Sequence, residues 1–307
     1  MKDGLILYGI NNIFTVQGDD GRYECRFKGK KLKDTKGEYS PLAPGDRVKW
    51  EIDENHAGKG MILSRIEREN NFSRWNKKRN SPQTLAANLD LLVCLTSPVS
   101  PPFRPRFIDR VLLLAAGHFP VLLVINKADQ GVADDIEESL EIYRSIGYDV
   151  MAVSAKTGQG LDELVKKIEG KRTAVVGQSG VGKSTLLNTL DPNFNLRVGE
   201  VSEKYNRGKH TTNYGIMLPW REGWIIDTPG IREIHVHGLE SRELAHFMPE
   251  FRPLIENCKM PSCLHMSEPK CAVKAAVEAG KIHPERYESY LRMYWGLKEI
   301  EEENPYG

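Results

Sequence analysis

Residues 177–184 match the pattern G-x-x-x-x-G-K-[ST], between an apolar run at 173–176 and a helix-compatible run at 185–190. Glycines at these spacings let a backbone wrap around a phosphate, so that N–H groups and a helix N-terminus converge on negative charge. We expect Lys183 to reach the β- and γ-phosphates of a nucleotide and the Ser184 hydroxyl to ligate Mg²⁺. The expected phosphate-loop residues are Gly177, Gln178, Ser179, Gly180, Val181, Gly182, Lys183, Ser184 and Thr185.

A carboxylate follows a second apolar run, residues 224–226, in the sequence Asp227-Thr228-Pro229-Gly230. The carboxyl end of a strand is where ligands bind in open α/β sheets. We expect Asp227 to hold Mg²⁺ through water and the Gly230 N–H to contact the γ-phosphate. The phosphate loop and this carboxylate do not by themselves distinguish GTP from ATP.

Base selection is the chemistry expected of two further loops, each placed after a predicted strand. A carboxylate at Asp129 can accept from the ring N–H and the exocyclic amine of guanine together, whereas adenine would leave the charge unpaired. The Ala155 N–H would donate to the guanine oxygen. We therefore predict GTP, with an ATP-dependent P-loop protein as the alternative. The expected base-contacting residues are Asn126, Lys127, Ala128, Asp129, Ser154, Ala155 and Lys156.

A cluster near the C-terminus supplies three thiols and one imidazole, from Cys258, Cys263, His265 and Cys271. Four ligands of this softness suit tetrahedral Zn²⁺, and a closed shell leaves no position for an activated water. We predict one structural zinc per chain, which stabilises the surrounding fold. The other cysteines, Cys25 and Cys94, lie in predicted strands and are interpreted as buried apolar side chains.

Hydrophobic periodicity divides the chain into three regions. Short alternating segments at 5–7, 23–27, 47–52 and 61–66 predict a small β-barrel or sandwich over residues 1–67. Strands at 91–95, 121–125, 150–154, 173–176 and 224–226 alternate with helical patterns and predict a parallel α/β domain over 68–240. Gly117, Gly147 and Gly170 mark helix ends, where a left-handed residue is needed. Residues 241–307 predict a small helical domain with a helix over 284–302.

Charge is balanced overall, because 43 Lys and Arg face 42 Asp and Glu. Any nucleic-acid contact must therefore come from a local surface. A lysine-rich segment, residues 28–36, is either a solvated loop or such a surface, and the basic stretch 74–79 is interpreted as the end of a linker. The longest apolar run, 111–125, is interrupted at 117–120 and is too short to cross a bilayer. Without a recognisable secretory signal, we expect a soluble cytoplasmic protein that binds no membrane.

The order of the motifs is unusual, because both base-reading segments precede the phosphate loop, whereas ordinary small GTPases carry the phosphate loop first. Together with the cysteine pattern, this order resembles the circularly permuted GTPases that depend on the small ribosomal subunit, the RsgA (YjeQ) family. The resemblance covers essentially the whole chain. It includes Ala86-Ala87-Asn88-Leu89-Asp90 and Phe247-Met248-Pro249-Glu250-Phe251.

The resemblance implies an OB-fold over 1–67 that binds RNA, a circularly permuted GTPase domain over 68–240 and a zinc domain over 241–307. It implies GTP hydrolysis, with GTP and GDP as ligands. It also implies a partner, the small ribosomal subunit and its RNA during late maturation. We expect a monomer. The alternative is an RNA-binding assembly factor in which GTP only regulates occupancy.

The resemblance also implies a switch loop at Gly208-Lys209-His210-Thr211-Thr212. There, a switch threonine would ligate Mg²⁺ in the GTP state, either Thr212, which we favour, or Thr211. Ile231 follows Gly230, where Ras-like enzymes carry a glutamine that orients the attacking water, and an alkyl group cannot do this. His210 is the expected substitute when the ribosome orders the loop, and the alternative is a mobile surface histidine. The catalytic candidates are Lys183, His210, Thr212 and Asp227.

Overall fold

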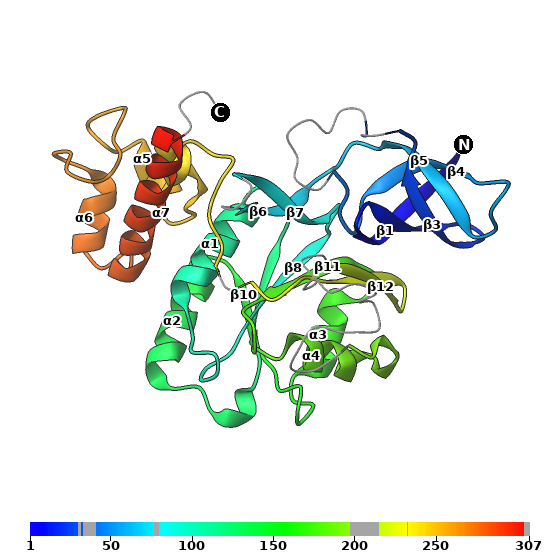
Figure 1. The fold of residues 1–307 in the computed structure, drawn as a ribbon. Helices are drawn as coiled ribbons and strands as arrows, with labels where there is room; N and C mark the ends of the chain where they lie inside the picture. Colours follow the sequence, from blue (N-terminus) through cyan, green and yellow to red (C-terminus); the bar gives the residue numbers. More distant parts are fainter. Residues whose placement is uncertain (30–31, 33–40, 77–79, 197–214, 232, 304–307) are drawn as a thin grey trace.

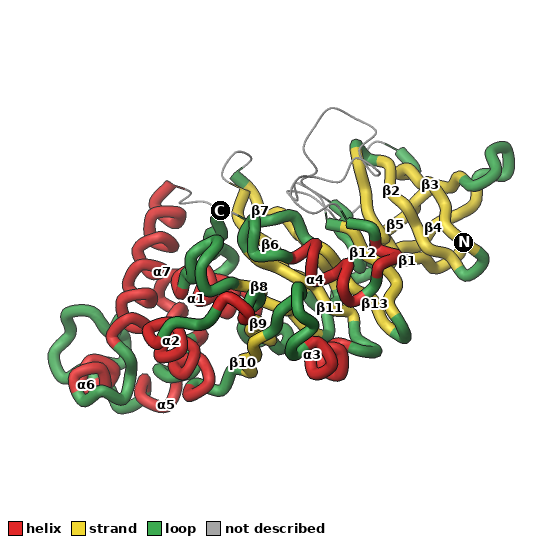
Figure 2. The backbone as a smooth tube through the Cα atoms, turned by 90° about the horizontal axis from the view of Figure 1, so that it is seen from below, coloured by secondary structure: helices red, strands yellow, loops and turns green. Residues whose placement is uncertain are grey.

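The computed structural model describes residues 1–29, 32, 41–76, 80–196, 215–231 and 233–303 of the chain. Three bodies follow one another, and the α/β body lies between the N-terminal barrel and the C-terminal helices (Figures 1 and 2). His210 and Thr212 lie outside the described residues.

The N-terminal body is a five-stranded closed barrel with strand order β1-β2-β3-β5-β4, which confirms the predicted OB-type barrel. Its interior is filled by alternate residues of the strands, including the fully buried Ile6, Val16 and Trp50. Gly4 makes room for the Trp50 indole, because a Cβ there would lie 2.7 Å from Nε1. The strands are β1 (Lys2–Ile10), β2 (Ile13–Gly18), β3 (Gly21–Phe27), β4 (Arg47–Ile52) and β5 (Lys59–Arg65).

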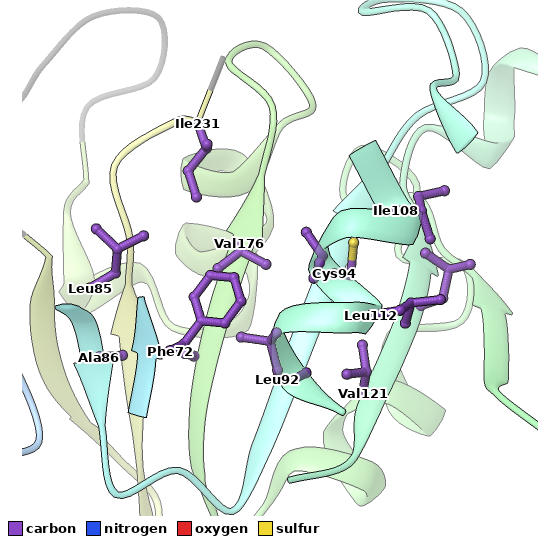
Figure 3. Packing of buried hydrophobic residues seen from close by; sticks show 14 of the residues in the cluster. Phe72, Leu85, Ala86, Leu92, Cys94, Ile108, Leu112, Val121, Val176 and Ile231 are labelled. Atoms are coloured by element: carbon purple, nitrogen blue, oxygen red, sulfur yellow. The ribbon is translucent and has the colours of Figure 1, made fainter. Parts of the chain in front are cut away.

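A hairpin of β6 (Asn71–Asn76) and β7 (Ser81–Ala87) connects the barrel to the α/β body. The interpretation of the basic stretch as a linker end is therefore wrong for residues 74–76, which are strand. The physical reason is tertiary, because Phe72 and Ala86 are fully buried in the core of the α/β body and fix the hairpin there (Figure 3). Residues 77–79 lie outside the described part of the chain.

The α/β body contains one six-stranded sheet with strand order β10-β9-β8-β11-β13-β12. Neighbouring strands are parallel except β12 and β13, which are antiparallel. All five predicted strands are present. The unpredicted β12 is an edge strand with an exposed Pro219, a residue that edge strands tolerate and that weakens the sequence signal. The strands are β8 (Leu91–Thr96), β9 (Val121–Ile125), β10 (Asp149–Ala152), β11 (Arg172–Gly177), β12 (Ile216–Trp220) and β13 (Gly223–Asp227).

Helices cover both faces of the sheet. On one face, α1 (Pro105–Ala115), α2 (Asp134–Ser145) and the hairpin pack in one cluster, which includes Ile108 and Leu92 (Figure 3). On the other face, α3 (Leu161–Ile168) and α4 (Lys183–Leu190) pack in a second cluster. The three predicted helix-ending glycines, Gly117, Gly147 and Gly170, have φ of 79°, 96° and 72°.

The C-terminal body is helical and has its own core around Phe251 and Tyr290. Leu113 of α1 is also buried in this core, so α1 contributes to two clusters. No helix in the described part of the chain is long and apolar enough to span a membrane. The elements are η4 (Ser241–Phe247), α5 (Arg252–Ile255), α6 (Ala272–Glu278) and α7 (Pro284–Glu303), and short 3₁₀ turns elsewhere are η1 (Ala128–Gln130) and η2 (Pro192–Phe194).

Candidate nucleotide site and cysteine cluster

Four of the predicted motifs follow β9, β10, β11 and β13, so the parallel sheet brings them to one edge. The predicted base-reading loops follow β9 and β10. In the strand order, β8 separates these loops from β11, which leads into the phosphate loop, and from β13, which ends at Asp227. This is the carboxyl edge, where ligands bind in open α/β sheets.

The phosphate loop connects β11 to α4 and requires two glycines in the left-handed region. Gly180 and Gly182 have φ of 86° and 90°, a region that costs other residues energy. A Cβ at Gly182 would also lie 2.5 Å from the Asn126 amide nitrogen. Val181 is fully buried between them and anchors the loop to the core. The backbone conformation thus follows directly from the glycine spacing of the motif.

Lys183 and Asp227, from the phosphate loop and β13, lie side by side. Lys183 Nζ is 3.3 Å from Asp227 Oδ1 as an ion pair, although the geometry falls short of a hydrogen bond and Oδ1 has no such partner among the described residues. Burial raises the pKa of Asp227, and the neighbouring Lys183 opposes this shift. A largely buried carboxylate with an oxygen that accepts no hydrogen bond suits a divalent cation. Ser184 and Asp227 are the described residues that would hold Mg²⁺.

Asn126 connects the base-reading edge to the phosphate loop. Its Nδ2 donates to the Val181 carbonyl at 2.9 Å, and its Oδ1 accepts from the Ala155 N–H at 3.1 Å. The side chain is 1% exposed. Both ends of the amide are therefore used to hold two loops at a fixed separation.

Lys127 makes a second connection. Its backbone is left-handed, with φ of 65°, and its Nζ donates to the Gly180 carbonyl at 2.8 Å and to the Ser100 carbonyl. The loop 97–104 after β8 thus belongs to the site, although sequence reasoning missed it. Ser100 offers only a backbone carbonyl, and no sequence pattern marks such a group.

Asp129 lies exposed in η1 and is oriented by the neighbouring loop. The buried Ser154 donates its hydroxyl to Asp129 Oδ1 at 2.6 Å and accepts from the Thr157 N–H at 3.1 Å. The Ala128 N–H donates to the Val153 carbonyl at 3.0 Å. The structure therefore brings the predicted base-reading residues together, with Lys156 exposed beside them.

The segment after Asp227 packs against the phosphate loop. A Cβ on Gly230 would lie 3.2 Å from the Ser179 Cα, so only glycine approaches this closely without displacement. Ile231 donates its N–H to the Gly177 carbonyl at 3.1 Å and is fully buried in the core near Val176 (Figure 3). The Ile231 side chain has no polar group and is also buried away from solvent, so it cannot orient an attacking water.

The cysteine cluster gathers at one point. The ligand atoms of Cys258, Cys263, His265 and Cys271 all lie within 4.8 Å of one another. His265 Nδ1 is 3.5 Å from Cys258 Sγ and 3.4 Å from Cys271 Sγ, and these two sulfurs are 4.0 Å apart. A tetrahedral zinc with Zn–S bonds of about 2.3 Å separates its ligands by about 3.8 Å. The donor set and its spacing fit a tetrahedral metal ion.

Neighbouring groups favour the metal-binding forms of His265, Cys258 and Cys271, whereas burial raises the pKa of the Cys263 thiol to about 12, so a metal ion would have to displace its proton. Burial lowers the pKa of His265, so the imidazole is the neutral species that metals bind. Backbone N–H groups donate to two sulfurs at 3.4 Å, from Ala272 to Cys258 and from Lys274 to Cys271. Such donors stabilise thiolates.

A phosphate loop, a carboxylate on the adjacent strand and base-reading loops that come first in the chain define a circularly permuted P-loop GTPase. The chain belongs to the RsgA GTPase family. The family model matches residues 65–237, and the RsgA N-terminal domain matches residues 3–62.

Full-length relatives agree with this assignment. The small ribosomal subunit biogenesis GTPase RsgA of Borreliella burgdorferi is 41% identical over 296 residues, which cover 95% of each chain. That of Geobacillus thermodenitrificans is 37% identical over 303 residues, or 97% of this chain and 98% of the relative.

Two solved structures are similar along nearly the whole chain. YjeQ from Thermotoga maritima has a TM-score of 0.74 and 32% identity, and the match covers 96% of this chain and 98% of that one. YloQ, described as a circularly permuted GTPase, has a TM-score of 0.70 and 28% identity over 97% and 96%. The barrel and the permuted sheet therefore occur together in solved relatives.

Proposed function

We propose that this GTPase acts in the maturation of the small ribosomal subunit, with turnover stimulated by that subunit. The observation that carries the chemistry is the gathering of the phosphate loop, Asp227 and the two base-reading loops at one sheet edge. The biological assignment is supported by the relatives named as small ribosomal subunit biogenesis GTPases. The cytoplasm, where ribosomal subunits mature in bacteria, is the proposed location.

Each site residue has a proposed role. Asp129 reads guanine, and the Ala155 N–H, which donates to Asn126 Oδ1 at 3.1 Å in the structure, would share this hydrogen bond with the guanine oxygen or transfer it there. The phosphate loop binds the phosphates through its N–H groups and Lys183. Ser184, Asp227 and Thr212 hold Mg²⁺, which would neutralise charge that develops on the phosphates. The resemblance to the family implies that His210 positions the attacking water, a role that the buried Ile231 cannot fill.

The flanking bodies have proposed roles as well. The barrel, with boundaries at about residues 1–67, binds ribosomal RNA through its surface. The domain at 241–307 binds one zinc ion through Cys258, Cys263, His265 and Cys271, which the ligand spacing supports. A closed shell of four protein ligands makes this zinc structural rather than catalytic.

The deciding experiment is phosphate release from GTP, measured with the isolated protein and with purified small or large ribosomal subunits. We expect slow hydrolysis alone, an increase of at least tenfold with small subunits, and no comparable increase with large subunits. A Lys183→Ala variant controls for contaminating nucleotidases, because it removes the cation that contacts the phosphates. Equal rates with and without small subunits would refute the proposal.

A further inference from the structure

One arginine of the C-terminal body reaches into the α/β body. Arg286, in the first turns of α7, pairs through Nη1 with Asp109 of α1 and donates from Nε to Glu250 Oε1 at 2.7 Å. The three side chains are only 5%, 3% and 7% exposed. A single guanidinium therefore joins α7 to α1 in a largely buried region.

Tyr143 of α2 completes this network. Its hydroxyl donates to Asp109 Oδ1 at 2.8 Å, and a longer contact of 3.2 Å reaches the Pro105 carbonyl. The Arg286 guanidinium lies 5.7 Å from the Tyr143 ring centroid. Burial raises the pKa of Tyr143, and the neighbouring Asp109 raises it further, so the hydroxyl stays a donor.

Stability alone does not account for such an arrangement. Well-packed apolar residues often replace buried ion pairs without loss of stability, and in some proteins the buried charges instead fix the geometry of the elements that carry them. Here the element whose position is fixed is α1. Its buried Asp109 pairs with Arg286 of α7, and its Leu113 is buried in the C-terminal core. The network and this packing hold α1 in one position relative to α7.

The N-terminal end of α1 leads to the nucleotide edge. α1 begins at Pro105, directly after the loop 97–104. Within that loop, Ser97 Oγ donates to the Pro101 carbonyl at 2.8 Å, which fixes its shape. The Ser100 carbonyl accepts from Lys127 Nζ, which also donates to Gly180 of the phosphate loop at 2.8 Å. A displacement of α1 would therefore move a direct support of the phosphate loop.

We infer that Arg286 is a positioning residue for the nucleotide site, which through Asp109 and α1 holds the 97–104 loop against Lys127 and the phosphate loop. Docking of the C-terminal body and binding of guanine nucleotide are then coupled. The route passes through Lys127 of the loop after β9 and does not use the segment after Asp227. This inference rests on the nucleotide site of the proposed function.

The main variant is Asp109→Asn, measured with the full-length, zinc-loaded protein and fluorescent GDP. Asparagine keeps the shape and still accepts from Tyr143, and the remaining Arg286–Glu250 pair is neutral, so the fold is retained. We expect GDP affinity to fall roughly fivefold or more, the usual lower bound for coupled sites. Arg292→Met is the matched control, because it breaks an exposed pair with Glu288 on the same helix and should leave affinity unchanged.

Reciprocity supplies a second readout that a purely structural role would not change. If α7 docking strengthens GDP binding, GDP must strengthen α7 docking equally. Hydrogen exchange over residues 284–290 should therefore slow when GDP binds to the wild type, and this effect should shrink in Asp109→Asn. The Tyr143→Phe variant, which removes only the hydroxyl, should show a smaller effect of the same sign.

The outcomes separate the two proposals. Weaker GDP binding together with lost reciprocal protection supports the inference. A lower melting temperature of Asp109→Asn with unchanged GDP affinity overturns it. Hydrogen exchange over residues 284–290 of the wild type that does not change when GDP binds also overturns it. A wild type that binds no guanine nucleotide instead overturns the proposed function.

Discussion

Replacing Asn126 by alanine tests the bridge between the base-reading edge and the phosphate loop. The substitution removes two hydrogen bonds, to the Val181 carbonyl and from the Ala155 N–H, at a side chain that is 1% exposed. Each buried backbone group left without a partner costs about 1–3 kcal/mol, so the total is about 2–6 kcal/mol. Part of this cost lowers the stability of the domain, and part lowers nucleotide affinity because both loops lose their fixed separation.

If about half of the cost, about 1–3 kcal/mol, appears in binding, GDP affinity falls roughly 5- to 140-fold, at 1.4 kcal/mol per tenfold. Titration with fluorescent GDP measures this, and a thermal melt measures the remaining loss of stability. Asn70→Ala is a matched control, because the Asn70 amide also donates to one backbone carbonyl and accepts from one backbone N–H, both of Leu89, at 3.0 and 2.7 Å. Leu89 lies just before β8, at the opposite edge of the sheet.

The control should lose stability and keep its GDP affinity within about twofold, since β8 begins at the edge away from the nucleotide. The reasoning is refuted if Asn126→Ala binds GDP as tightly as the wild type. It is also refuted if Asn70→Ala loses affinity by the same factor, because the bridge would then have no special role.

Three further substitutions test the nucleotide site and the cysteine cluster. Asp129→Asn keeps an acceptor for Ser154 but loses the charged partner of guanine, so GDP affinity should fall roughly 10- to 100-fold and xanthosine diphosphate should gain, as competition titrations will show. Cys263→Ser or strong chelation should abolish zinc binding, measured as metal content, and increase hydrogen exchange over 241–303 while the sheet stays protected. Asp227→Asn should stop hydrolysis yet raise the melting temperature of nucleotide-free protein at pH 7.

The sign of the Asp227 prediction follows from its raised pKa. A carboxyl group whose folded pKa lies above its unfolded value favours folding below the unfolded pKa, and this contribution is lost as pH rises through the folded pKa. The higher melting temperature of Asp227→Asn relative to the wild type should therefore disappear towards pH 4. A difference in melting temperature that grows on acidification would contradict burial as the cause of the raised pKa. Unchanged GDP preference in Asp129→Asn, or full zinc content in Cys263→Ser, would exclude those residues as base reader and metal ligand.

The sequence determined the chemical groups and their order. The glycines at 177, 180 and 182, with Lys183 and Ser184, specify a phosphate loop because local backbone conformation follows from residue type. The apolar periods located all five predicted strands of the sheet, and the cysteine and histidine spacing located four side chains that the structure brings together as a possible metal site. Permutation is itself a property of order along the chain, so no structure was needed to detect it.

Tertiary structure alone decided the supports of these groups. β6 is a strand because Phe72 is buried in a core built from distant segments. Ser100 contributes only a carbonyl to Lys127. Arg286 meets Asp109 across 177 residues of sequence. Such contacts depend on how elements pack rather than on local pattern, and residue type constrains the conformation of near neighbours far more than the choice of distant partners.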